Sequence, residues 1–128
     1  MVLIGAGEEK KLDELAVQKL GGRIQSFLNA AKIVDATVFF ESKDLAQDAA
    51  NMAFGANLQS YRFNQYFVDK KKDKEIKLQN LSFAVADVSK TKERYKELGI
   101  FANNIFMVRD LVSQPSNIFN PGRYAEIF

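Results

Sequence analysis

The chain contains no cysteine and no histidine. Without cysteine it forms no disulfide and no thiolate metal cluster, and nothing indicates an oxidising compartment. Histidine is the commonest general base near neutral pH and the commonest transition-metal ligand, so its absence removes the usual centre of such chemistry. Any catalysis would depend on lysine, carboxylate or tyrosine side chains.

Long apolar runs and a strong net charge are also lacking. No run approaches the roughly 20 apolar residues that span a bilayer, and residues 1–4 enter Gly5 without the basic leader or cleavage site of a signal peptide. The 18 basic and 16 acidic residues give a net charge of +2, which is too balanced to indicate a polyanionic partner. With 128 residues, 47% of them hydrophobic, we expect one folded cytoplasmic domain and no membrane partner.

The first third of the chain predicts a strand, a turn and a long helix. Residues 2–4 are apolar and precede a glycine turn, so we expect a buried strand whose sheet neighbours lie upstream, followed by a helix that Glu8 and Glu9 open. Apolar side chains at intervals of three and four predict one amphipathic helix over residues 12–31. Gly21 and Gly22 in its middle indicate either a bend or the close approach of another backbone.

The middle of the chain predicts two strands around a second helix. Residues 34–40 are β-branched and aromatic with apolar side chains on both faces, which is typical of a strand covered on both sides. Ser42 is the expected cap of a helix whose small residues permit close packing and which runs on toward residues 61–63. Alternation over residues 81–85 predicts a strand with Leu81 on its larger-residue face.

The last third predicts helices. Ser89 or Thr91 is the expected cap, and Gly99 either ends this helix or marks a joint with the next one. The following helix has a predicted apolar stripe of Phe101, Ile105, Val108 and Val112. Asn120 and Pro121 start another helix, in which proline occupies the first turn, and we expect the chain to be cut within it.

Two segments, and the order of the elements, resemble the leucyl aminopeptidase family. Residues 60–66, Ser-Tyr-Arg-Phe-Asn-Gln-Tyr before a lysine run, resemble a segment near the end of the family's amino-terminal domain. Residues 108–121, followed by Tyr-Ala-Glu at 124–126, are similar to its interdomain helix and the opening of its catalytic domain. Residues 2–7 and 20–23 fit the same order, so the resemblance spans the whole chain.

The resemblance implies a three-layer, macrodomain-like α/β domain truncated at both ends. Residues 1–99 would form the partial amino-terminal domain, 100–114 the interdomain linker helix and 115–128 the first residues of a missing catalytic domain. In the family, lysine, aspartate and glutamate of that missing domain hold two divalent metal ions, manganese or zinc. The resemblance therefore assigns no catalytic, cofactor-binding or metal residue to this chain, and it implies a hexameric parent that removes amino-terminal residues, preferentially leucine, from peptides.

The glycine turn at residues 5–7 is a candidate phosphate site, because glycines let main-chain amides approach an anion at a helix start. A dinucleotide fingerprint needs a third glycine where Lys10 stands, and Glu8 and Glu9 would repel a phosphate. We favour a plain turn. Macrodomains bind ADP-ribose, but that relation is an analogy of fold.

Residues 61–77 combine cations with aromatic rings, which could pair phosphate contacts with base stacking. Asp69, Asp73 and Glu75 dilute the charge, so we favour a solvated surface connection. The candidate binding residues are Lys70, Lys71, Lys72 and Lys74 with Tyr61, Phe63, Tyr66 and Phe67.

Two further sets of charged residues are candidates. Arg109 and Asp110 could form a catalytic ion pair, but we favour a structural role in which they tie two domains together and are left partly unpaired here. The acidic pairs Asp13–Glu14 and Asp44–Asp48 lie on predicted helix surfaces, where solvated charges are favoured over a metal site.

We therefore expect the non-catalytic amino-terminal part of a two-metal leucyl aminopeptidase, inactive alone and contributing to assembly and to active-site access. Peptide substrate would bind only to the missing catalytic domain. Exposed sheet edges predict self-association. The alternative function is a nucleic-acid or nucleotide binding module that uses residues 61–77.

Overall fold

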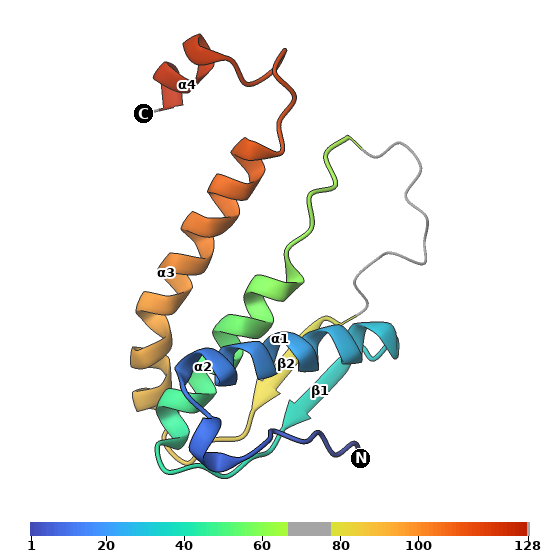
Figure 1. Cartoon of the computed structure of the whole chain (residues 1–128), viewed down its shortest axis with the longest axis vertical. Coiled ribbons are helices and arrows are strands. Elements are labelled where there is room, and N and C mark those ends of the chain that lie inside the picture. The colour runs from blue at the N-terminus through green and yellow to red at the C-terminus, as the bar shows by residue number, and fades with distance from the viewer. Residues whose placement is uncertain (67–77, 128) are drawn as a thin grey trace.

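A pair of parallel strands lies against two helices, and a long third helix extends away from them in the computed structural model of the chain, which describes residues 1–66 and 78–127 (Figure 1). The amino-terminal end lies by the sheet, and the carboxy-terminal end lies at the far end of the molecule. In chain order the elements are the 3-10 helix η1 (Glu9–Lys11), α1 (Glu14–Ala30), β1 (Asp35–Val38), α2 (Leu45–Ser60), β2 (Asn80–Phe83), α3 (Val88–Val112) and α4 (Pro121–Ile127).

The two strands place their apolar side chains on one face of the sheet. β1 and β2 are parallel, with Asp35 opposite Asn80 and Val38 opposite Phe83. Val38, Leu81 and Phe83 pack against a buried cluster of Val17, Ile24 and Met52 from α1 and α2. Full burial of such a side chain contributes about 1.5–3 kcal/mol, so this cluster joins the helical layer to the sheet.

The α/β class is confirmed, and the described residues build two of the three expected layers. Alternate residues of both strands, among them Thr37 and Ser82, remain exposed on the face opposite the helices. The predicted larger-residue face of the second strand is confirmed. The prediction that residues 34–40 are covered on both sides is wrong for this chain, because α1 and α2 pack on the same face and Phe39 remains 79% exposed.

Helices α1 and α2 cross through glycines. A Cβ built on Gly21 would lie 1.9 Å from the carbonyl oxygen of Met52, and one built on Gly55 would lie 1.8 Å from the carbonyl oxygen of Gln18. Of the two alternatives for the central glycines, close approach of another backbone is therefore correct at Gly21. The long amphipathic helix itself is confirmed, with bounds Glu14–Ala30.

Residues 2–4 form no strand, and this prediction is wrong. Val2 is 58% exposed and Leu3 is 87% exposed, because the described sheet contains only β1 and β2 and offers these residues no pairing partner. Glu8 and Glu9 do not open a long helix either. They lie at the three-residue η1, which ends before Asp13 begins α1.

Aspartates cap all three long helices of the described chain. The Asp13 carboxylate accepts a hydrogen bond from the Ala16 amide (2.7 Å), and Asp44 and Asp87 play the same part for α2 and α3. The predictions of Ser42 as the cap of α2, and of Ser89 or Thr91 as the cap of α3, are wrong. A carboxylate at the N-cap also gains from the helix dipole, which a hydroxyl does not.

Helix α3 is continuous through Gly99, so neither a helix end nor a joint lies there. Ala102 of this helix is buried, whereas three of its apolar residues are exposed: Phe101 (63%), Val108 (52%) and Val112 (80%). The predicted apolar stripe therefore lies mostly on the open side of α3. The predicted start of the last helix is confirmed, since Pro121 opens α4 and the Asn120 side chain accepts from the Arg123 amide at 3.1 Å.

Candidate functional site

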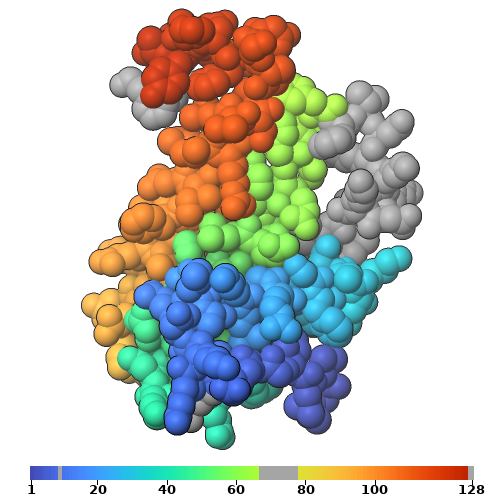
Figure 2. Space-filling view, viewed as in Figure 1, coloured from blue at the N-terminus to red at the C-terminus, as the bar shows by residue number. Residues whose placement is uncertain are grey.

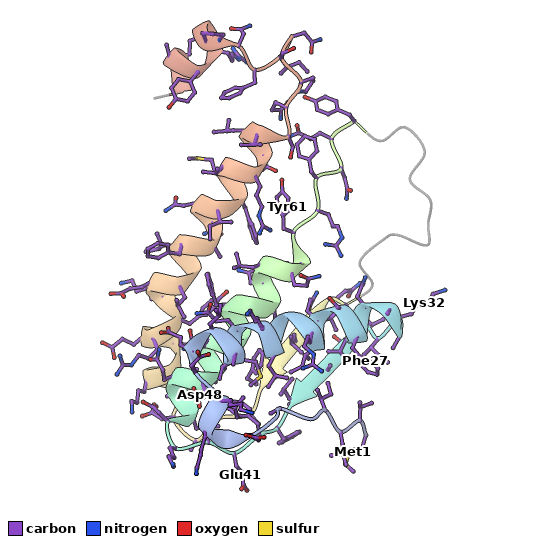
Figure 3. All side chains as sticks on the ribbon, in the orientation of Figure 1. Met1, Phe27, Lys32, Glu41, Asp48 and Tyr61 are labelled. Atoms are coloured by element: carbon purple, nitrogen blue, oxygen red, sulfur yellow. The ribbon has the colours of Figure 1, made fainter. Side chains whose placement is uncertain are left out.

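Tyr61 joins the end of α2 to the carboxy-terminal half of α3 (Figure 3). Its hydroxyl donates a hydrogen bond of 2.7 Å to Asp110, and its ring stacks on Phe106 with centroids 5.3 Å apart. The Arg109 guanidinium carbon lies 5.3 Å from the same ring centroid, within the range of a cation–π contact. The predicted pair Arg109–Asp110 thus clamps one tyrosine from two directions.

Electrostatics at this cluster keep the tyrosine protonated. Burial, then the hydrogen bond and the negative charge of Asp110, raise the pKa of Tyr61, while a side-chain hydrogen bond with Ser113 and the Arg109 charge oppose the rise. A phenol with a raised pKa is neutral at physiological pH. It acts here as a hydrogen-bond donor that holds α3, not as a base.

Arg109 and Asp110 each have a hydrogen-bond partner within the chain, and the expectation that they are left partly unpaired stays a prediction. Asp110 accepts from Tyr61, and Arg109 donates to the Leu58 carbonyl oxygen at 3.3 Å. The tie continues toward the end of α3, where Tyr66 donates to Gln114 and the Gln114 amide donates to Gln65 at 2.7 Å. Residues 61–66 therefore line α3, which supports the structural role.

The glycine turn at residues 5–7 lacks the helix start that a phosphate site needs. Gly7 has a φ of +96°, and a Cβ added to Gly5 or Gly7 would meet only open space. The turn leads into η1, a helix too short to concentrate amide dipoles, and α1 starts only at Glu14. The plain turn that we favoured is therefore the better interpretation.

One aspartate of each acidic pair caps a helix. Asp13 caps α1, and Asp44 caps α2 while lying 3.8 Å from the ammonium of Lys90. In residues 1–66 and 78–127 no three carboxylate, histidine or cysteine side chains gather as metal ligands would. Asp87 was missed as a cap, although aspartate is among the preferred N-cap residues and Asp87 directly precedes the helix; its carboxylate accepts from the Lys90 amide.

The structure describes only part of the lysine–aromatic stretch at residues 61–77. Phe67 and Lys70, Lys71, Lys72 and Lys74 lie outside the described residues. Among the described aromatic residues, the ring of Tyr61 stacks on that of Phe106. Phe63 and Tyr66 form a tilted ring pair with centroids 5.7 Å apart.

An open groove of about 980 Å³ lies along α1 in the described structure, and sequence reasoning missed it. Its α1 wall runs from Leu15 to Phe27, with Lys19 and Arg23 between them. Residues 2–5 form part of its wall, and the end of α2 with Arg109 completes it. Lys19 and Arg23 are four residues apart, a spacing that places them on one helix face and could have signalled a basic edge.

No helix within the described chain is long and apolar enough to cross a membrane. The strand–helix–strand unit, its glycine-packed helices and the tyrosine-tied α3 define a small α/β domain that ends in a long helix. Residues 1–70 match the model of the cytosol aminopeptidase family, N-terminal domain, and the chain belongs to that family.

Proteins with similar sequences are named as members of the same family. A probable cytosol aminopeptidase of Ehrlichia ruminantium (strain Gardel) is 34% identical over 128 residues, covering 99% of this chain and 25% of that protein. One from Rickettsia bellii (strain OSU 85-389) is 31% identical over 132 residues, covering 98% and 26%. The chain thus spans about a quarter of the length of these relatives.

A solved structure agrees on the fold. A mutant of tomato leucine aminopeptidase superposes with a TM-score of 0.74 at 20% identity, covering 88% of this chain and 23% of that chain. The predicted resemblance to the amino-terminal part of this family is confirmed. At this identity the structural likeness concerns the fold alone.

Proposed function

We propose that this chain serves as the non-catalytic amino-terminal portion of an aminopeptidase whose remaining part removes amino-terminal residues, preferentially leucine, from peptides. The observation that carries the proposal is the match of residues 1–70 to the family's N-terminal domain, together with coverage of only a quarter of the relatives' length. Cytoplasmic location and a hexameric parent belong to the same proposal.

The parent is proposed to use two divalent metal ions, manganese or zinc. The described residues do not fit such a site, because two of the candidate carboxylates, Asp13 and Asp44, are occupied as helix caps and no cluster of three ligands exists among them. Metal ligands would have to come from outside the described residues. We derive no catalytic step from this chain.

The proposed contributions are assembly and control of access to the active site. Helix α3 is 25 residues long and is held to the α/β unit through Tyr61. A movement of that unit would therefore move the helix with it. Its exposed Phe101, Val108 and Val112 provide apolar surface for contact with further protein. Self-association of the chain is part of this proposal.

The first test is the coding sequence on both sides of the chain, followed by activity. Flanking sequence with upstream strands and a downstream lysine–aspartate–glutamate metal motif is the expected result. The purified chain with manganese is expected to leave a leucine amide intact, and the product of the longer coding sequence to hydrolyse it. Turnover by the purified chain alone would overturn the proposal.

A second candidate function is nucleic-acid or nucleotide binding through residues 61–77, supported by the paired rings of Phe63 and Tyr66. Such binding should shift DNA in a gel at low salt and weaken as salt is added. Changing Lys70, Lys71 and Lys72 to glutamate should abolish the shift. Absence of any shift at low salt would remove this candidate.

A further inference from the structure

A cavity of about 530 Å³, which we call the β2 cavity, lies between the helices and β2. This volume is within the usual range for small-molecule sites. Its described lining residues come from α1, α2, β2 and α3 and from the chain just before β2, and all of them lie between positions 25 and 95. Neither end of the chain therefore contributes to its walls.

The elements around the β2 cavity pack closely. In Figure 2, α1 (blue) covers β2 from the front, and α3 (orange) lies beside α2 (green). In Figure 1 the N end lies on the β1 side of the sheet, whereas α3 lies on the β2 side. The β2 cavity thus belongs to the part of the domain that internal segments build.

The apolar part of the cavity comes from the sheet and from small residues of α2. Leu81 and Phe83 pack toward the helices and line the cavity, and the buried Leu78 adds to the same wall. Ala53 and Ala56 line it from α2, where their short side chains leave room for an occupant. A flat apolar group would replace water against these side chains, which is favourable.

Gln25 supplies an amide that has no partner. The residue is 6% exposed, and its side chain forms no hydrogen bond within the described residues. Buried polar side chains are normally hydrogen-bonded, and an amide can both donate and accept. Because Gln25 lines the cavity, an occupant can meet both needs.

A second polar group faces the cavity from α3. The Asn57 side chain donates to the hydroxyl oxygen of Tyr95 at 3.0 Å, and both residues line the cavity. Since that oxygen is the acceptor, the hydroxyl proton of Tyr95 remains available to donate to an occupant.

None of the described lining residues carries a charge. An ionised occupant would lose its hydration there without gaining an opposite charge, which is costly. A neutral occupant is therefore favoured over a carboxylate or a phosphate.

From this combination we propose that the β2 cavity binds a small, uncharged aromatic carboxamide. The ring of the occupant lies against Leu81 and Phe83, and its carboxamide exchanges hydrogen bonds with the Gln25 amide. The Tyr95 hydroxyl donates to the carbonyl oxygen of the occupant. This binding is independent of whether a longer form of the chain hydrolyses peptides.

The test is a nuclear magnetic resonance titration of the full chain with benzamide, benzoate and toluene. Benzoate has the same shape as benzamide but carries a charge, and toluene lacks the polar group. Benzamide should bind at least about tenfold more tightly than either, because it alone is neutral and offers both a donor and an acceptor.

The glutamine has a matched control. Gln25→Met keeps the length of the side chain and should weaken benzamide binding about tenfold. It should not lower the urea midpoint of the free chain, because it removes a buried amide that has no partner, whereas loss of a merely structural hydrogen bond would lower it. Gln59→Met, at an exposed position of α2 outside this cavity, should leave benzamide binding unchanged.

A second variant tests the space itself. Ala53→Leu should fill the cavity and abolish binding of benzamide and of toluene alike. Circular dichroism of each variant establishes that it is folded.

The proposal would be overturned by absence of any shift at millimolar benzamide, by equal affinity for benzamide and toluene, or by tighter binding of benzoate. Unchanged binding in Gln25→Met would overturn it as well. The product of the longer coding sequence should bind benzamide equally, and loss of binding there would overturn the proposal too. Failure of that product to hydrolyse a leucine amide would instead count against the proposed function alone.

Discussion

Gly21 of α1 lies directly against the carbonyl oxygen of Met52 in α2, at a distance where a Cβ on Gly21 would be only 1.9 Å from that oxygen. The neighbouring Gly22 has more room, because its nearest contact would be the Gly55 carbonyl oxygen at 3.5 Å. Two adjacent glycines in one helix therefore serve different purposes.

Gly21→Ala should lower the free energy of unfolding by about 2–3 kcal/mol, because backbone atoms of α2 cannot move aside without separating the helices. Gly22→Ala is the matched control and should raise it by up to about 1 kcal/mol through better helix propensity. Urea unfolding followed by circular dichroism measures both. Similar effects of the two substitutions would contradict the close crossing.

Asn51 is 1% exposed, and its side-chain oxygen accepts from the Gln18 amide at 2.9 Å, while its own Nδ2 has no partner among the described residues. Gln18→Leu should cost about 1–3 kcal/mol, because it leaves the whole Asn51 amide buried without a hydrogen bond. Adding Asn51→Leu should recover much of that loss. A double-mutant cycle in urea checks this, and simple additivity of the two losses would refute the coupling.

Asp87→Ala should lower the free energy of unfolding by about 1 kcal/mol, since it removes the acceptor that lies 2.9 Å from the Lys90 amide at the start of α3. Ser89→Ala should change it by less than about 0.5 kcal/mol, the usual range for a surface substitution. Thermal unfolding of the two variants decides which residue caps α3. A larger effect at Ser89 would restore the cap predicted from the sequence.

The raised pKa of Tyr61 makes stability depend on pH only in alkaline solution. Its contribution is complete below the ordinary tyrosine pKa of about 10 and is lost as pH rises through the higher folded-state pKa. Tyr61→Phe should remove this part of the alkaline loss and lower the urea midpoint at neutral pH. Urea titrations near neutral pH and above about pH 10 measure it, with Tyr124→Phe as control, and an unchanged alkaline slope in Tyr61→Phe would contradict the assignment.

Local patterns in the sequence predicted the helices, both parallel strands and the start of α4, because helix and strand periodicities are properties of short segments. The caps were less predictable. Serine, threonine and aspartate are all good caps, and the choice between Ser89 and Asp87 depends on where the first turn begins. The family resemblance rested on residues 60–66 and 108–121, and it is confirmed by the match over residues 1–70.

The groove along α1 was beyond sequence reasoning, because its walls come from segments far apart in the chain. Lys19 and Arg23 lie on α1, whereas Arg109 lies on α3. No pattern within a short segment of sequence shows that these three cations line the same groove.

What the sequence by itself determined is the long helices, the two paired strands and the family, since these depend on local residue order. Tertiary structure alone decided which face of α3 is inside. Hydrophobicity favoured the stripe through Phe101 and Val108, yet the inner face carries Ala102, Phe106 and Asp110, since Tyr61 offers a ring and a hydroxyl there. Tyr61 and Asp110 are 49 residues apart, and such a contact forms only once α2 and α3 lie side by side.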